Sequence, residues 1–159
     1  NYQKDTPPAE IARQLAIRKA EAVAKRHTKG LVIGSDQLAV IDDQILGKPH
    51  THDNAIKQLQ QCSGKRVTFL TGLALINAET SCVQCCVEPF NVHFRQLTPE
   101  QIDNYLRKET PYDCAGSFKS EGLGIALFEK LEGDDPNSLI GLPLIRLIAM
   151  LEKEGIRVI

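Results

Sequence analysis

Segments with helical hydrophobic spacing alternate along the chain with short apolar runs. After the Pro-Pro pair at 7–8, apolar residues recur every three or four positions, which predicts a helix that Gly30 stops. The run Leu31-Val32-Ile33 comes directly after it and predicts a buried strand that ends at Gly34. A helix leading into a buried strand is typical of α/β proteins, and the alternation continues to the end of the sequence.

Turn residues between the apolar segments define the other expected elements. The acidic pair at 42–43 separates two short apolar runs and predicts a hairpin turn, which would bring Lys48 back toward Asp36. Thr98, followed by proline and by Gln101 three positions on, predicts a capped helix start. The remaining expected elements are a helix from about 51–53 to 61, strands over 66–76 and 83–94, strands near 114–118 and 124–128, and a closing helix over 144–154.

Composition narrows the class of protein. With 159 residues, of which 42% are hydrophobic and 25% charged, the chain is typical of one globular domain, residues 1–159, with a sizeable core. The 19 basic and 20 acidic residues give a net charge of −1, which disfavours a surface for DNA or for anionic lipid. No apolar stretch reaches the ~18 residues of a membrane span and no signal peptide opens the chain, so we expect a soluble, cytoplasmic protein.

Several groups that often carry chemistry are better explained as structure. The five cysteines are an odd number, and Cys82 and Cys85 would point to opposite faces of a strand, so we expect reduced thiols that share no zinc. The segment 134–137 has the composition of a turn and a helix cap. The four histidines, at 27, 50, 52 and 93, have no sequence neighbour that suggests a metal ligand set or a catalytic triad, and the role of the last stays open.

Three polar, glycine-flanked segments are the best candidates for a ligand site. Asp36 follows the first buried strand, where a carboxylate has no use in packing, and ligand sites of α/β folds gather where such strands end. Gly47-Lys48-Pro49 and the loop 116–122 come later in the chain. Together these segments would supply carboxylates and cations to one phosphate-bearing substrate.

The order and spacing of short motifs also carry a family resemblance. The motifs are Leu-Ala-Ile-Arg-Lys-Ala at 15–20, Gly-Ser-Asp-Gln at 34–37, Gly-Lys-Pro at 47–49, Ser-Gly at 63–64, Thr-Gly at 71–72, Ala-Gly-Ser-Phe-Lys-Ser-Glu-Gly at 115–122 and Gly-Leu-Pro at 141–143. Over nearly the whole chain they resemble the Maf-like nucleotide pyrophosphatases. Gln37 and the Lys-Ser-Glu of 119–121 are most similar to the 7-methyl-GTP pyrophosphatase branch, whereas the dTTP/UTP branch has Thr and Gln at those places.

The resemblance implies a fold and a reaction. The fold is a twisted mixed sheet flanked by helices, with two lobes around a central cleft, as in Maf proteins and inosine triphosphatases. The reaction is hydrolysis of a nucleoside triphosphate, with 7-methyl-GTP favoured, between the α and β phosphates with Mg²⁺ or Mn²⁺. Asp36 would deprotonate the attacking water or hold the metal, and Lys19 and Lys48 would offset the negative charge of the phosphates.

The later loop would recognise the base, with Gln37 contributing. If residues 117–121 are extended, Ser117, Lys119 and Glu121 share one face. A carboxylate accepts hydrogen bonds from both N1 and the exocyclic amino group of guanine, and methylation of the ring adds positive charge that strengthens them. Glu121 therefore favours a methylated guanine.

Two further expectations follow from the same resemblance. Members of the family begin with a strand and a Ser-x-Ser-x-x-Arg phosphate-binding loop, and an Asp-Glu pair follows later. This sequence starts downstream of both, so we expect a truncated chain with weak or no activity. Two other functions stay open, an inosine-triphosphatase-like house-cleaning hydrolase and a nucleotide-binding regulator of cell division or septum formation. The possible protein partner is a second copy of the chain.

Overall fold

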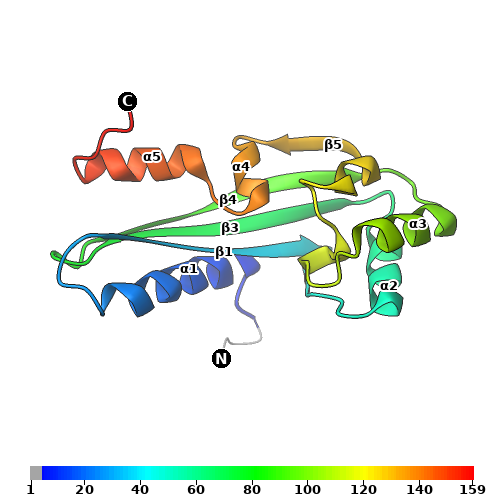
Figure 1. Ribbon diagram of the computed structural model, residues 1–159, viewed down its shortest axis with the longest axis horizontal. Helices are drawn as coiled ribbons and strands as arrows, with labels where there is room; N and C mark the ends of the chain where they lie inside the picture. Colours follow the sequence, from blue (N-terminus) through cyan, green and yellow to red (C-terminus); the bar gives the residue numbers. More distant parts are fainter. Residues whose placement is uncertain (1–4) are drawn as a thin grey trace. The chain divides into compact units, whose positions relative to one another are not determined.

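Helices and strands alternate in the computed structural model, which describes residues 5–159 (Figure 1). In chain order the elements are α1 (Pro8–Ala24), β1 (Leu31–Ile41), β2 (Gln44–Leu46), α2 (His52–Cys62), β3 (Arg66–Asn77), β4 (Val83–Phe94), α3 (Pro99–Glu109), the 3₁₀ turns η1 (Ala115–Ser117) and η2 (Leu123–Leu127), β5 (Phe128–Gly133), α4 (Pro136–Ile140) and α5 (Leu144–Lys153). No helix among the described residues is both long and apolar enough to span a membrane.

The strands form one sheet in the order β2-β1-β3-β4-β5. β1 pairs with β2 and β4 pairs with β5, both antiparallel, with Ala39 opposite Leu46 and Phe90 opposite Gly133. The α/β class and the helix-flanked sheet are confirmed, and the strands run antiparallel where we expected a mixed sheet. The chain divides into two compact units, and β1, β3 and β4 contribute residues to both.

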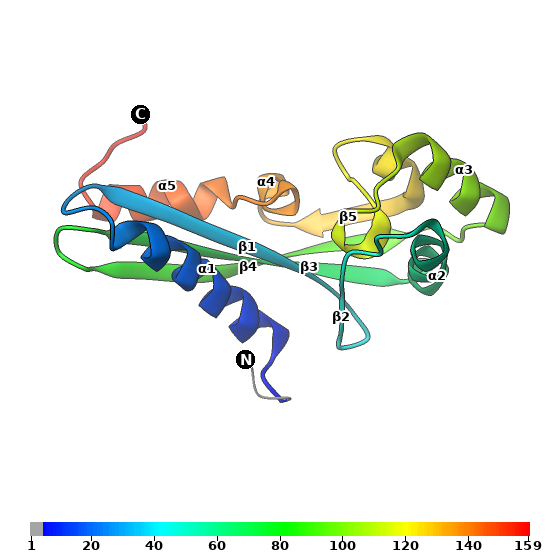
Figure 2. The ribbon, with the colours of Figure 1, turned by 60° about the horizontal axis from the view of Figure 1, so that its bottom comes forward.

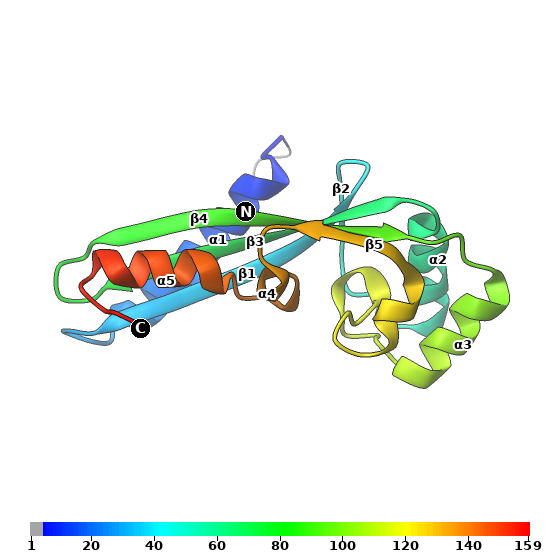
Figure 3. The same ribbon diagram turned by 90° about the horizontal axis from the view of Figure 1, so that it is seen from above.

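Unit 1 comprises the residues up to Gln37, Leu70–Pro89 and the residues from Asp135 onward. Its helices α1 and α5 lie on opposite faces of the sheet (Figure 2, Figure 3). The alternation of β3 explains this, because successive side chains of a strand point to opposite faces. Ala74 and Ile76 pack against α1, whereas Leu73 and Leu75 pack against Leu147 and Met150 of α5.

Unit 2 comprises Leu38–Phe69 and Phe90–Asp134. Its helices α2 and α3 lie side by side (Figure 3). Four phenylalanines meet edge to face in its interior, with ring centroids 5.1–5.4 Å apart, and aromatic pairs in this arrangement are favourable. They are Phe69, Phe94, Phe118 and Phe128.

Most expected helix starts and turns are confirmed. Asp42 and Asp43 form the β1–β2 turn with positive φ angles of 48° and 65°, the conformation that two-residue hairpin turns favour. Thr98 caps α3 in a capping box with Gln101. Asp135 caps α4, in agreement with the cap expected at 134–137.

Three expectations about local structure were wrong. The first helix ends at Ala24, not at Gly30. β1 does not stop at Gly34 but continues to Ile41, so Asp36 lies inside a strand. The segment near 114–118 contains a 3₁₀ turn, in which Gly116 and Ser117 adopt positive φ angles of 79° and 66° rather than the extended conformation. The segment near 124–128 is a 3₁₀ turn as far as Leu127.

Candidate active site

Asp36 and Lys19 form an ion pair within unit 1. Asp36 projects from the middle of β1, and its side chain is 19% exposed. Lys19 lies on α1, and its Nζ is 2.5 Å from Asp36 Oδ1. The structure therefore brings together two of the three residues that we expected to be catalytic.

A close approach of α1 to the sheet produces this pair. Ala12, Ala16 and Ala20 recur every four residues on α1 and are fully buried. They face Gly34 of β1 and Gly72 of β3, where an added Cβ would lie only 2.3 Å from Ala16 O and 2.2 Å from Ala12 O. The small residues thus let helix and strand backbones nearly touch, which leaves Lys19, beside this row, within reach of Asp36.

The side chain of Gln37 lies on the opposite face of β1 from the side chain of Asp36. Its Nε2 lies 2.9 Å from Thr71 Oγ1, 2.8 Å from Ser138 O and 3.1 Å from Leu139 O. An amide nitrogen has two hydrogens, so it satisfies at most two of these acceptors at once. The amide is therefore occupied in holding α4 against the sheet, and a contact of Gln37 with a substrate stays a prediction.

Asp135 fixes the connection between α4 and α5. Its side chain is fully buried, and Oδ1 accepts from Asn137 N at 2.8 Å while Oδ2 accepts from Ile145 N at 2.9 Å. Burial alone would raise the pKa of Asp135, but the hydrogen bonds donated by the backbone N–H groups of Ile145 and Asn137 hold it below its usual value. The group is therefore an ionised structural anchor.

Lys48 lies in unit 2, in a loop between β2 and α2 that we call the lysine loop, residues 47–51. Its side chain is exposed. The loop ends at Thr51, whose hydroxyl accepts from Asn54 N at 3.2 Å and caps α2. Asp36 and Lys48 lie in different units, so their proximity stays a prediction.

Residues 115–122, the recognition loop, do not form the extended segment that we expected. Ser117 is fully buried and its hydroxyl donates to Gln58 Oε1, while the next residue, Phe118, is buried among the aromatic rings. Lys119 and Glu121 are exposed. The alternation that would place Ser117, Lys119 and Glu121 on one face is therefore wrong, because the loop turns rather than running as a strand.

Backbone hydrogen bonds join the recognition loop to the lysine loop. Gly116 N donates to Gly47 O at 3.3 Å, and His50 N donates to Tyr112 O at 3.0 Å. Gln58 of α2 bridges the two loops, because its Nε2 donates to Gly47 O at 2.9 Å and its Oε1 accepts from Ser117. Unit 2 thus holds Lys48 and the loop of Lys119 and Glu121 in one hydrogen-bonded assembly.

Two residues of unit 2, Gln58 and His52, make contacts that the sequence does not predict. In the sequence Gln58 looks like an ordinary polar residue of a helix, because its hydrogen-bond partners are 11 and 59 positions away. His52 had no partner among its sequence neighbours, yet it contacts Asp103 and Tyr112. Long-range contacts of this kind leave no periodic signal in one sequence.

The described residues contain no group of three or more His, Cys, Asp or Glu side chains arranged to hold a metal ion. Asp36 is the carboxylate that the sequence predicts as a metal ligand. Mg²⁺ is often held by one or two carboxylates together with substrate phosphates, so this side chain fits a cation that a nucleotide brings with it. The five cysteines are free thiols.

Comparison with known proteins identifies the family. Residues 1–154 match the model of the Maf-like protein family. A 7-methyl-GTP pyrophosphatase of Colwellia psychrerythraea is 56% identical over 157 residues, which cover 99% of this chain and 78% of the relative. Proteins with the same name from Pseudomonas syringae and Pseudoalteromonas translucida are each 58% identical, covering 99% and 96% of this chain and 82% and 75% of the relatives. The chain therefore belongs to the Maf-like protein family.

Proposed function

We propose that this protein hydrolyses 7-methyl-GTP to 7-methyl-GMP and pyrophosphate. The observation that carries the proposal is the pair of Asp36 and Lys19, joined at 2.5 Å on a tightly packed strand and helix. A carboxylate held beside a cation suits phosphoryl chemistry, which needs charge neutralisation and a positioned water more than covalent help. The names of the relatives supply the choice of nucleotide.

Asp36 orients the attacking water and accepts its proton. The side chain is mostly buried, so its position is defined by the strand that carries it. Lys19 is 56% exposed, so its ammonium group can offer hydrogens that are not used in the bond to Asp36 to a phosphate oxygen. Lys48 adds a second positive charge toward the phosphates. Asp36 would also hold a divalent cation together with the substrate, and that cation would supply further positive charge beside the phosphates.

Glu121 and Lys119 are the residues that select the base. Both are exposed on a loop whose backbone is anchored by Phe118 in the aromatic interior. Glu121 accepts hydrogen bonds from the guanine edge, and the added charge of a 7-methyl group strengthens them. Ser117 supports this loop from within, through its hydrogen bond to Gln58.

The test is pyrophosphate release with Mg²⁺ or Mn²⁺ by a version of the protein that includes the N-terminal phosphate-binding loop expected from the family resemblance, comparing 7-methyl-GTP with GTP, ITP, UTP and dTTP. We expect the highest kcat/KM with 7-methyl-GTP. A preference for ITP would favour the inosine-triphosphatase-like alternative. Tight nucleotide binding without pyrophosphate release from any of the five would favour the regulator and overturn the proposal.

A further inference from the structure

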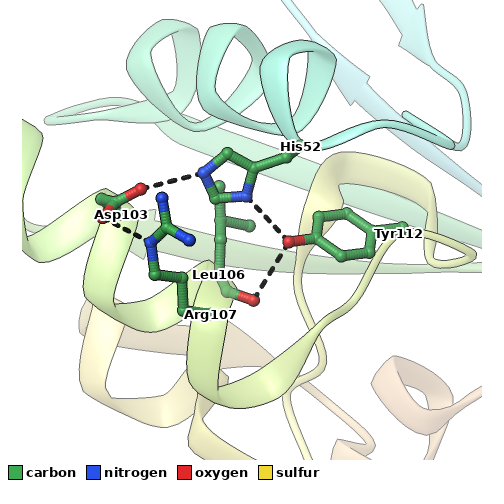
Figure 4. Close-up of polar contacts among 5 residues, drawn as sticks. All are labelled: His52, Asp103, Leu106, Arg107 and Tyr112. Carbon is green, nitrogen blue, oxygen red and sulfur yellow. Dashed lines mark hydrogen bonds and ion pairs between the residues drawn. The ribbon is translucent and has the colours of Figure 1, made fainter.

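A chain of side-chain contacts connects α2, α3 and the segment that leads into the recognition loop (Figure 4). His52, the first residue of α2, lies with Nε2 2.9 Å from Asp103 Oδ1 and with Nδ1 2.8 Å from the hydroxyl of Tyr112. Arg107 Nε donates to the other oxygen of Asp103 at 2.8 Å. Tyr112 OH is also 3.4 Å from Leu106 O.

The polarity of these contacts is determined by Asp103. Hydrogen bonds from Arg107 and then from His52 lower its pKa, so Asp103 is an anion that only accepts. His52 Nε2 must therefore carry a hydrogen. When Nδ1 is bare it accepts from Tyr112 OH, and when it is protonated it donates to that oxygen, which then donates to Leu106 O. The same heavy-atom positions serve both states of His52.

These contacts bring the two loops of unit 2 to a common anchor. His52 begins α2 directly after the lysine loop, and Tyr112 lies three residues before the recognition loop. The backbone bond from His50 N to Tyr112 O lies beside the side-chain contact. Tyr112 is thus held at its carbonyl and at its hydroxyl, and both contacts come from the segment that follows Lys48.

We propose that His52 and Tyr112 are positioning residues that set the recognition loop relative to Lys48 and so determine how well the base is read. This inference rests on the proposed function of Lys48, Lys119 and Glu121. The contribution to overall stability is small, because the side chains of His52 and Asp103 are 28% and 38% exposed and partly exposed ion pairs add little. The effect on geometry is larger, since small displacements of contacting groups reduce catalysis strongly.

The experiment uses His52→Ala and Tyr112→Phe in the full chain, with His52→Gln as the conservative variant. Glutamine has one donor and one acceptor, so it restores a bond to Asp103 and a bond from Tyr112. The matched control is His93→Ala. His93 has the same side-chain exposure of 28% and also contacts a carboxylate, Glu132 at 3.2 Å, but it lies on β4, outside both loops.

We expect His52→Ala and Tyr112→Phe to raise the KM for 7-methyl-GTP. The ratio of kcat/KM for 7-methyl-GTP to kcat/KM for UTP should fall by roughly tenfold. We expect His52→Gln to recover most of this preference and His93→Ala to retain it. If the role were merely structural, Tm would fall and the fraction of active protein would fall equally in the assay with each nucleotide. The KM values and the preference for 7-methyl-GTP over UTP would then be unchanged. That pattern, or an equal effect of His93→Ala, would overturn the proposal.

Hydrogen exchange gives a readout that does not depend on turnover. The amide of Gly116 is bonded to the lysine loop and the amide of His50 to Tyr112 O, and we expect both amides to exchange faster in His52→Ala than in the wild type or in His93→Ala. Unchanged exchange at both amides would overturn the positioning role. Absence of pyrophosphate release from the wild type would reject the proposed function instead. In that case the exchange measurement would still decide whether His52 holds the loop.

Discussion

The two units hold their candidate residues in different ways. In unit 1, Asp36 projects from β1 and Lys19 from α1, and the backbones of these two elements nearly touch at Gly34. In unit 2, Lys48 and Glu121 lie on loops that are joined by single hydrogen bonds and by one bridging glutamine. Regular elements therefore fix the proposed chemistry, while loops carry the proposed choice of base.

This contrast between the two units indicates where substitutions are tolerated. A strand packed under a helix resists any added atom, because interiors are close-packed. A loop held by a few hydrogen bonds can change its side chains without rebuilding the core. Substitutions in unit 1 should therefore abolish turnover or stability, and substitutions in the loops of unit 2 should change specificity.

The largest expected effect tests the chemistry of unit 1. Asp36→Asn keeps the shape of the side chain but removes the base and the negative charge, so we expect turnover to fall ~10²–10⁴-fold while Tm changes little. The measurement is pyrophosphate release with thermal denaturation. Asp42→Asn is the matched control, since Asp42 also pairs with a lysine, Lys65 at 3.2 Å, in a hairpin turn of unit 2. Wild-type turnover in Asp36→Asn would show that Asp36 does not carry the chemistry assigned to unit 1.

Asp135→Asn tests the structural anchor of the same unit. The variant places an amide NH₂ against backbone N–H donors and should lower the free energy of unfolding by about 3 kcal/mol, the upper range for hydrogen bonds to a charged group. Because the folded pKa of Asp135 is lowered, its stabilising contribution is complete above the unfolded pKa of about 4 and is lost as the pH falls through the folded value.

The deficit of Asp135→Asn should therefore be large at pH 7 and should shrink below about pH 4, as urea unfolding at several pH values would measure. Asp134→Asn, at an exposed neighbour, should behave like the wild type at each pH. A deficit that is the same at neutral and acidic pH would mean that Asp135 is not stabilised as an anion.

Gly34→Ala tests the close contact beneath Asp36. The new Cβ would lie 2.3 Å from Ala16 O, so helix and strand must separate, and we expect a loss of about 2 kcal/mol in unfolding free energy. The control is Gly47→Ala in the lysine loop, where no heavy atom lies within 4 Å of the added Cβ. Equal stabilities of the two variants in urea unfolding would contradict the contrast between packed strand and loop.

Glu121→Gln tests the choice of base in unit 2. Glutamine offers one acceptor and one donor, so one of two bonds to the guanine edge becomes a donor facing a donor. We expect the preference for 7-methyl-GTP over UTP or dTTP to fall by roughly tenfold, equivalent to about 1.4 kcal/mol, with Tm unchanged. The ratio of kcat/KM values gives the answer, and an unchanged ratio would show that Glu121 does not read the base.

The sequence predicted regular elements better than loops. Thr98 was expected to cap a helix, and it caps α3, whose buried residues Ile102, Tyr105 and Leu106 recur at helical spacing. The prediction of an extended recognition loop was wrong because the positive φ angle of Ser117 depends on tertiary contacts. Asp36 was singled out by its position after an apolar run and Lys19 by the family resemblance, while Gln58 and His52 depend on contacts that one sequence does not display.

The opposite orientation of Asp36 and Gln37 has a consequence for how the gene can change. Because side chains alternate along β1, inserting or deleting one codon between Leu31 and Ser35 would exchange the faces of the strand residues that follow, including Asp36 and Gln37. The carboxylate would then face α4, and the amide would face Lys19. Length variation among natural relatives should therefore be confined to the connecting turns, and insertion scanning of the gene should find this stretch among the least permissive.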